Sequence, residues 1–166
     1  MATKANFTAE EWSQVLGSVM MAGMAVTLSD PSGLIGLTKE GLASGSALVA
    51  AKSDPKANGL IKAVVSDFET SDGRSAARST VQSKLAGKEA SEMKGIILAT
   101  LAQSAALVDT KAPDDTAGFK GWLRQISERV ADASSEGGFL GFGGVQVSDA
   151  EKATLEEISK ALKLTA

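Results

Sequence analysis

The stretch PDDTAGFKGWLRQISERVADA, residues 113–133, decides the fold class because its apolar side chains recur with the period of an α-helix. One face of this helix is formed by Phe119, Trp122, Leu123, Ile126, Val130 and Ala133. Four charged residues stay outside that face: Lys120, Arg124, Glu128 and Arg129. The pattern is typical of a helix that begins at Pro113-Asp114 and packs one face on a hydrophobic core.

Local start signals predict further helices on both sides of this stretch. Thr8 and Glu11 fit a capping box, which starts a first helix that reaches about Leu28. Phe7 is placed to pack on Trp12 at the same helix start. Other helices are expected over residues 38–52 with Thr38 as N-cap, from Asp54-Pro55 to about Thr70, over residues 88–109, and from a Ser148–Glu151 capping box to Leu164. Residues 74–87 fit either a short helix or a mobile connector.

No stretch alternates apolar and polar residues with the period of a strand. The sequence therefore predicts an all-α fold, a single domain over residues 1–166 built as a bundle of six or seven helices. The segments 33–37 and 138–142 share the pattern glycine, apolar, apolar, glycine, apolar, and each precedes a predicted helix. Two related helix-loop-helix units and convergence on a good corner sequence both explain this match.

The composition excludes several classes of function. The chain contains no histidine and no cysteine, which removes the usual ligands of zinc, haem and iron–sulfur centres and any disulfide. Its net charge is -3 with both signs interspersed, so we expect no nucleic-acid partner. The longest apolar run, from Val15 to Leu28, is shorter than the ~20 residues of a membrane span and predicts a buried core helix. We expect a cytoplasmic protein.

The glycine-rich segment EGGFLGFGGVQVSDAE, residues 136–151, raises the question of a phosphate-binding loop. Such a loop needs Lys-Ser/Thr after its glycines, whereas Gly143 and Gly144 are followed by Val145 and Gln146. A packed corner fits better, because three large apolar side chains there gain from burial. No catalytic set and no cofactor-binding residue is predicted in the chain.

Five acidic residues at the two glycine-containing corners are candidate metal ligands. They are Asp30 and Glu40 at the first corner, and Glu136, Asp149 and Glu151 at the second. If the corners converge, these carboxylates supply the oxygen ligands that Ca²⁺ or Mg²⁺ prefers. The competing interpretation is that Asp149 and Glu151 only satisfy a helix N-terminus.

The C-terminal pattern Ser-x-x-Glu-x-x-x-Leu-x-x-Ile-x-x-x-Leu is formed by Ser148, Glu151, Leu155, Ile158 and Leu162. With the acidic-glycine corner before it, this region resembles the tellurite-resistance TerB-like helical family, mainly over residues 128–164. The resemblance implies a cytoplasmic, stress-linked helical module that associates with metals or membrane complexes. An apolar glycine insert separates the corner from the capping box here, which departs from the family pattern.

Together these features predict a non-catalytic binding or scaffold protein in a bacterial-type stress response. The partner is expected to be another protein or a second copy of the chain. Gly41 and Gly45, one turn apart, permit close approach of a helix from either source. The alternatives are a Ca²⁺- or Mg²⁺-binding protein and an enzyme that uses carboxylates and lysines alone.

Overall fold

The computed structural model describes residues 1–29, 37–135 and 147–164, apart from the side chains of residues 37–44 and 134–135. Its elements are a short 3-10 helix η1 (Lys4–Asn6) and the helices α1 (Ala9–Thr27), α2 (Leu37–Ser53), α3 (Gly59–Phe68), α4 (Ser71–Leu85), α5 (Ala90–Lys111), α6 (Thr116–Ser135) and α7 (Asp149–Ala161). These ranges contain no strand, so the predicted all-α bundle of six or seven helices is confirmed for the part of the chain described.

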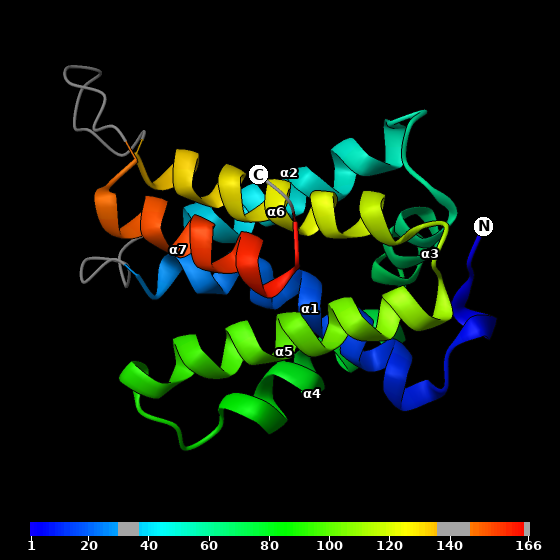
Figure 1. The fold of residues 1–166 in the computed structure, drawn as a ribbon, viewed down its shortest axis with the longest axis horizontal. Helices are drawn as coiled ribbons and strands as arrows, with labels where there is room; N and C mark the ends of the chain where they lie inside the picture. Colours follow the sequence, from blue (N-terminus) through cyan, green and yellow to red (C-terminus); the bar gives the residue numbers. More distant parts are fainter. Residues whose placement is uncertain (30–36, 136–146, 165–166) are drawn as a thin grey trace.

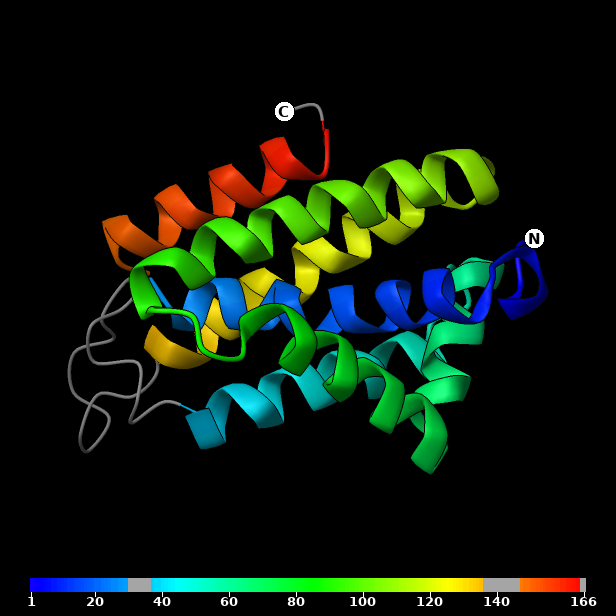
Figure 2. The ribbon, with the colours of Figure 1, turned by 90° about the horizontal axis from the view of Figure 1, so that it is seen from below.

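Helix α1 runs through the middle of the bundle (Figures 1 and 2). It contacts each of the helices α2 to α7. In the view of Figure 2, α5 and α7 lie on one side of it, and α2 and α4 lie on the other. This position explains the apolar run from Val15 to Leu28 and confirms that it forms a buried core helix. None of the described helices combines the length and the apolar content that a membrane crossing demands.

The predicted start of α1 is confirmed. The Thr8 hydroxyl accepts a hydrogen bond from the backbone N–H of Glu11 at 3.2 Å. The Glu11 carboxylate accepts one from the backbone N–H of Thr8 at 2.8 Å. The rings of Phe7 and Trp12 pack with their centroids 5.6 Å apart. The capping box and the aromatic contact together fix where the chain enters the central helix.

Helix α6 packs its predicted apolar face on the core. Phe119, Leu123, Ile126 and Val130 are fully buried. Ser127 lies among them and donates its hydroxyl proton to the backbone carbonyl of Ala22 in α1 at 2.7 Å. This bond satisfies the buried hydroxyl and ties α6 to the central helix.

Lys120 is predicted to stay outside the apolar face of α6, yet it is buried. Its side chain is only 8% exposed, and Nζ lies 2.6 Å from Oδ1 of Asp109 in α5. The Thr116 hydroxyl donates to the same oxygen at 2.6 Å. These hydrogen bonds, from Lys120 first and Thr116 second, hold the pKa of Asp109 below its usual range. A carboxylate on the neighbouring helix therefore allows a lysine to be buried, which the sequence of α6 alone does not reveal.

The prediction that Asp54 caps a helix beginning at Pro55 is also wrong. Asp54 instead closes a turn, with Oδ1 accepting from the backbone N–H of Lys56 at 2.8 Å. Helix α3 begins after Asn58, whose side-chain oxygen accepts from the backbone N–H of Ile61 at 3.0 Å. Asp54 and Asn58 are both favourable N-cap residues, and the helix begins after Asn58.

Residues 74–87, which fit a helix or a connector in sequence, belong mainly to α4. The helix is capped by Thr70, whose hydroxyl accepts from the backbone N–H of Gly73 at 3.0 Å. Ala77, Val81 and Leu85 form its buried face. Helix α4 packs on α1, where the Thr80 hydroxyl donates to the backbone carbonyl of Ser13 at 3.0 Å.

Helix α2 differs from its prediction at two points. It begins at Leu37, so Thr38 lies in its first turn and is not its N-cap. Gly45 is not a point of close approach within the described chain, since a Cβ added there would have no atom within 4 Å. Val49, one turn further along, is 68% exposed. Contact of this face with a second copy of the chain stays a prediction.

Gly17 marks a close approach of α1 and α4, since an added Cβ would lie 2.5 Å from Cγ2 of Thr80. We expect Gly17→Ala to lower the free energy of unfolding by about 1–3 kcal/mol. Gly95→Ala in α5 is the matched control, because a Cβ there meets no atom within 4 Å. It should raise stability by about 0.5–1 kcal/mol. Urea denaturation measures both, and an unchanged stability of Gly17→Ala contradicts the tight contact. Adding Thr80→Ser to the Gly17→Ala variant should restore part of the lost stability, because serine lacks the Cγ2 methyl group that the new Cβ meets.

The ion pair of Asp109 with Lys120 makes stability depend on pH. Folding lowers the pKa of Asp109 below 3.8, so its contribution is present above that value and lost as the pH falls through the lowered one. Asp109→Asn should reduce stability at pH 7 and flatten the decline of stability with acid below pH 3.8. Thermal melts across this range measure the slopes. Asp72→Asn, at an exposed position of α4, is the control, and equal slopes for both variants would refute the assignment.

Candidate functional site

The five acidic residues predicted as metal ligands fall only partly within the described structure. Asp30 and Glu136 lie outside it, and Glu40 lies in α2 at a position whose side chain is outside it. Asp149 and Glu151 belong to the first turn of α7. The described ends of α1, α2, α6 and α7 that flank the two corners lie at one end of the bundle (Figures 1 and 2). Convergence of the five carboxylates stays a prediction.

The two described members of this set have different surroundings. Glu151 is buried, and its carboxylate accepts from the backbone N–H of Ser148 at 2.7 Å. The Ser148 hydroxyl accepts in return from the backbone N–H of Glu151 at 3.2 Å, which confirms the predicted capping box. Asp149 is fully exposed, with Oδ1 3.7 Å from Nζ of Lys152. Across residues 1–29, 37–135 and 147–164, no three acidic side chains gather as metal ligands would.

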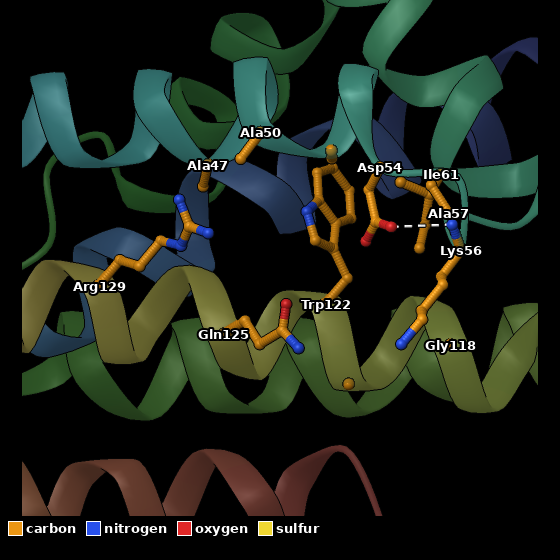
Figure 3. A pocket seen from close by; sticks show the side chains of 12 residues that line it. Ala47, Ala50, Asp54, Lys56, Ala57, Ile61, Gly118, Trp122, Gln125 and Arg129 are labelled. Carbon is orange, nitrogen blue, oxygen red and sulfur yellow. Dashed lines mark hydrogen bonds between the residues drawn. The ribbon is translucent and has the colours of Figure 1, made fainter.

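A pocket of about 330 Å³ opens between α2 and α6 (Figure 3). Buried residues form its inner surface: Ala47, Ala51, Ala57, Ile61 and Trp122. Exposed polar residues stand around it: Asp54, Lys56, Gln125 and Arg129. The volume lies at the lower end of the range for small-molecule sites, and the lining combines apolar walls with a few polar groups as such sites do.

One stripe of α6 supplies much of the pocket. Gly118, Trp122, Gln125 and Arg129 recur at helical spacing and face α2. Gly121 lies beside them, and a Cβ added there would have no atom within 4 Å. At Gly118 the same addition would lie 2.6 Å from the amide nitrogen of the residue that caps α3. Gly121 therefore leaves open space, and Gly118 lets the connection between α2 and α3 come close.

Hydrogen bonds hold that connection against the start of α6. Asn58 donates from Nδ2 to the backbone carbonyl of Asp115 at 2.7 Å. The buried carboxylate of Asp115 accepts from the backbone N–H of Ala2 at 2.5 Å, so the N-terminal segment is held at the same place. Asp54 closes the turn that carries Lys56. These contacts fix the backbone from which Lys56 extends beside the pocket (Figure 3).

Four of the five polar side chains at the pocket make no hydrogen bond or ion pair to the described part of the chain, Asp54 being the exception. The described structure gives no side-chain hydrogen bond or ion pair to Lys56, Trp122, Gln125 or Arg129. Trp12, the other tryptophan of the chain, donates its indole N–H to Asp67 at 2.6 Å. In Figure 3, Arg129 and Lys56 lie on opposite sides of Trp122, and the indole nitrogen is on the side of Arg129. The pocket thus offers hydrogen-bond donors that the fold does not use.

Arg129 lies outside the apolar face of its helix, as its position in the sequence predicts, and it is exposed, but the sequence does not predict the pocket beside it. The available signal is the pair Gly118 and Gly121 near the start of an amphipathic helix, next to Trp122. Each glycine costs a helix about 1 kcal/mol relative to alanine, so two of them beside one aromatic residue indicate a special packing requirement. Sequence alone does not tell whether that requirement is a close contact or a cavity.

Comparison of the chain with protein-family models, with curated proteins and with solved structures finds no match. The TerB-like resemblance of residues 128–164 therefore stays a prediction.

Glu151→Ala tests whether this carboxylate serves the helix cap or a metal. The cap interpretation predicts a loss of about 1 kcal/mol, because the Ser148 N–H loses its acceptor and the helix start loses a negative charge. The loss should be equal in EDTA and in millimolar Ca²⁺ or Mg²⁺, as measured by thermal melts. A larger loss with the ion present would support a metal ligand, since ion binding stabilises the folded state. Asp149→Ala, at the exposed neighbouring position, should cost less.

Proposed function

We propose that this protein is a non-catalytic binding protein that receives a small molecule in the pocket between α2 and α6. The observation that carries the proposal is the pocket itself, which small apolar side chains line together with the ring of Trp122, whose indole N–H is open to the pocket and makes no hydrogen bond to the described protein. An indole N–H is a donor only, and that of Trp12 has a protein acceptor. A ligand in the pocket would provide one for Trp122.

The side chains at the pocket favour binding over catalysis. General acid–base catalysis requires a group that gains or loses a proton near the working pH, and the chain has no histidine or cysteine. Asp54 supplies the carboxylate among the described lining residues, and it already closes the Lys56 turn. An enzyme that uses carboxylates and lysines alone is the alternative. Turnover of an ester or phosphoester that Asp54→Asn abolishes would support it.

The sequence supports a biological role for this binding protein. The TerB-like resemblance favours a cytoplasmic role in a bacterial-type stress response, with a protein partner or a second copy of the chain. Ca²⁺ or Mg²⁺ binding by the acidic corners is a second candidate, favoured by the position of the flanking helix ends at one end of the bundle. Calorimetry with each ion tests that candidate separately from the pocket.

Gly121→Leu should block the pocket without weakening the fold. The position lines the pocket and has open space around an added Cβ, and leucine is a better helix former than glycine by roughly 0.5–1 kcal/mol. The probes are 2-naphthoate and 2-naphthalenemethanol, two flat molecules that differ in charge. We expect at least one to bind the parent protein with a millimolar or lower Kd, and Gly121→Leu to lose that binding.

Fluorine NMR of 5-fluorotryptophan-labelled protein locates the binding. The chain has two tryptophans, and the resonance of Trp122 should shift on titration while that of Trp12 stays in place. Gly95→Leu in α5 is the matched control, because it also adds leucine at a helical glycine with open space and lies outside the pocket. The proposal is wrong if neither probe binds, or if both leucine variants bind as the parent does.

A further inference from the structure

The pocket between α2 and α6 carries more positive than negative charge. Among its described lining residues, Lys56 and Arg129 are cations and Asp54 is an anion. Asp54 is occupied in its own turn, where it accepts from a backbone N–H at 2.8 Å. Neither cation has an ion-pair partner in the described ranges. This local surplus contrasts with the net charge of -3 of the whole chain.

The hydrogen-bonding groups at the Arg129 end of the pocket are donors. A guanidinium has five N–H donors in a planar fork and no acceptor, and an indole N–H is a donor only. In Figure 3 the indole nitrogen of Trp122 is on the side of Arg129, and the amide of Gln125 lies between the two along the helix. Gln125 is a helical neighbour of both Trp122 and Arg129, and in Figure 3 the guanidinium of Arg129 and the indole nitrogen of Trp122 face the space between them. A carboxylate or a phosphate matches the guanidinium fork in charge and in geometry.

The rest of the pocket suits an apolar body. Ala47, Ala51 and Ala57 line it with small side chains, and Ile61 and Trp122 add larger apolar surfaces. A volume of about 330 Å³ is small for a nucleotide with its sugar and phosphates and is suited to a molecule of one or two rings. A ligand here would bury its apolar part against Trp122 and the alanines of α2.

We infer that the pocket binds a small, flat, apolar molecule carrying one anionic group, a carboxylate or a phosphate, and that Arg129 and the indole N–H of Trp122 receive that group. The inference rests on the proposed binding function and specifies its ligand class. Lys56 lies on the other side of Trp122 and contributes positive potential to the pocket without contacting the anion. Arg129 is then the residue that distinguishes an anionic ligand from a neutral one of the same shape.

Isothermal titration calorimetry with three matched probes tests the inference: 2-naphthoate, 2-naphthyl phosphate and 2-naphthalenemethanol. The probes share one ring system, so differences in affinity report the anionic group. We expect at least one of the two anions to bind the parent protein about tenfold or more tightly than the alcohol does, the size expected of a charged hydrogen bond. The tighter anion identifies whether a carboxylate or a phosphate is preferred.

Arg129→Gln should lower the affinity for the preferred anion about tenfold and leave the affinity for the alcohol unchanged. Arg78→Gln is the matched control, since it removes the same charge at an exposed position of α4. Lys56→Gln should have a smaller effect than Arg129→Gln. Thermal melts of all three variants check that the fold is retained.

Different results would contradict the ligand class, the role of Arg129 and the binding function. If the alcohol binds as tightly as both anions and Gly121→Leu blocks it, the binding function stands and the anionic ligand class is wrong. If Arg129→Gln and Arg78→Gln reduce anion binding equally, or if Lys56→Gln has the largest effect, the assignment to Arg129 is wrong. If none of the three probes binds, both the inference and the proposed function fail.

Discussion

The packing of α1 against every other described α-helix is the constraint on which the rest of the structure depends. A helix enclosed on all sides must be apolar on all sides, and its neighbours can come close only where its residues are small. Gly17 meets Thr80 of α4, and the backbone carbonyl of Ala22 accepts from Ser127 of α6. The low aromatic content of the chain, 4%, follows from the same constraint, because few large rings fit between such closely packed helices.

The pocket lies between α2 and α6, which are close neighbours, at a place where small side chains leave space. Trp122 of α6 lies there between glycines of its own helix and alanines of α2. Helices usually lie 8–10 Å apart, with side chains filling the space between them. The small residues on both sides of the Trp122 ring leave space beside it. Gly17 thus gives a close contact and Gly121 gives a cavity, although both are helical glycines.

Strong local signals predicted the fold well, and tertiary neighbours explain the failures. The caps at Thr8 and Ser148 and the buried helix α1 follow from nearby residues, so the sequence predicted them correctly. Lys120 is buried because Asp109 faces it from α5, and no pattern within α6 reveals that neighbour. Asp54 and Asn58 are both suitable N-caps near α3, and the helix begins after Asn58, whose side-chain amide also donates to the backbone carbonyl of Asp115. The sequence does not predict the pocket for the same reason, because two segments far apart in sequence form it.

Two pairs of similar residues differ in whether the described protein provides a hydrogen-bond partner. Trp12 and Trp122 are both buried, yet only the first donates its N–H to the protein, at 2.6 Å from Asp67. Lys120 and Arg129 are both cations of α6, and only the first has a carboxylate partner. The indole N–H of Trp122 is not among the buried unpaired atoms of the described structure, so it faces the open space of the pocket, as the exposed Arg129 does. Both groups can donate to an acceptor that enters the pocket, which favours the pocket over the acidic corners as the proposed ligand site.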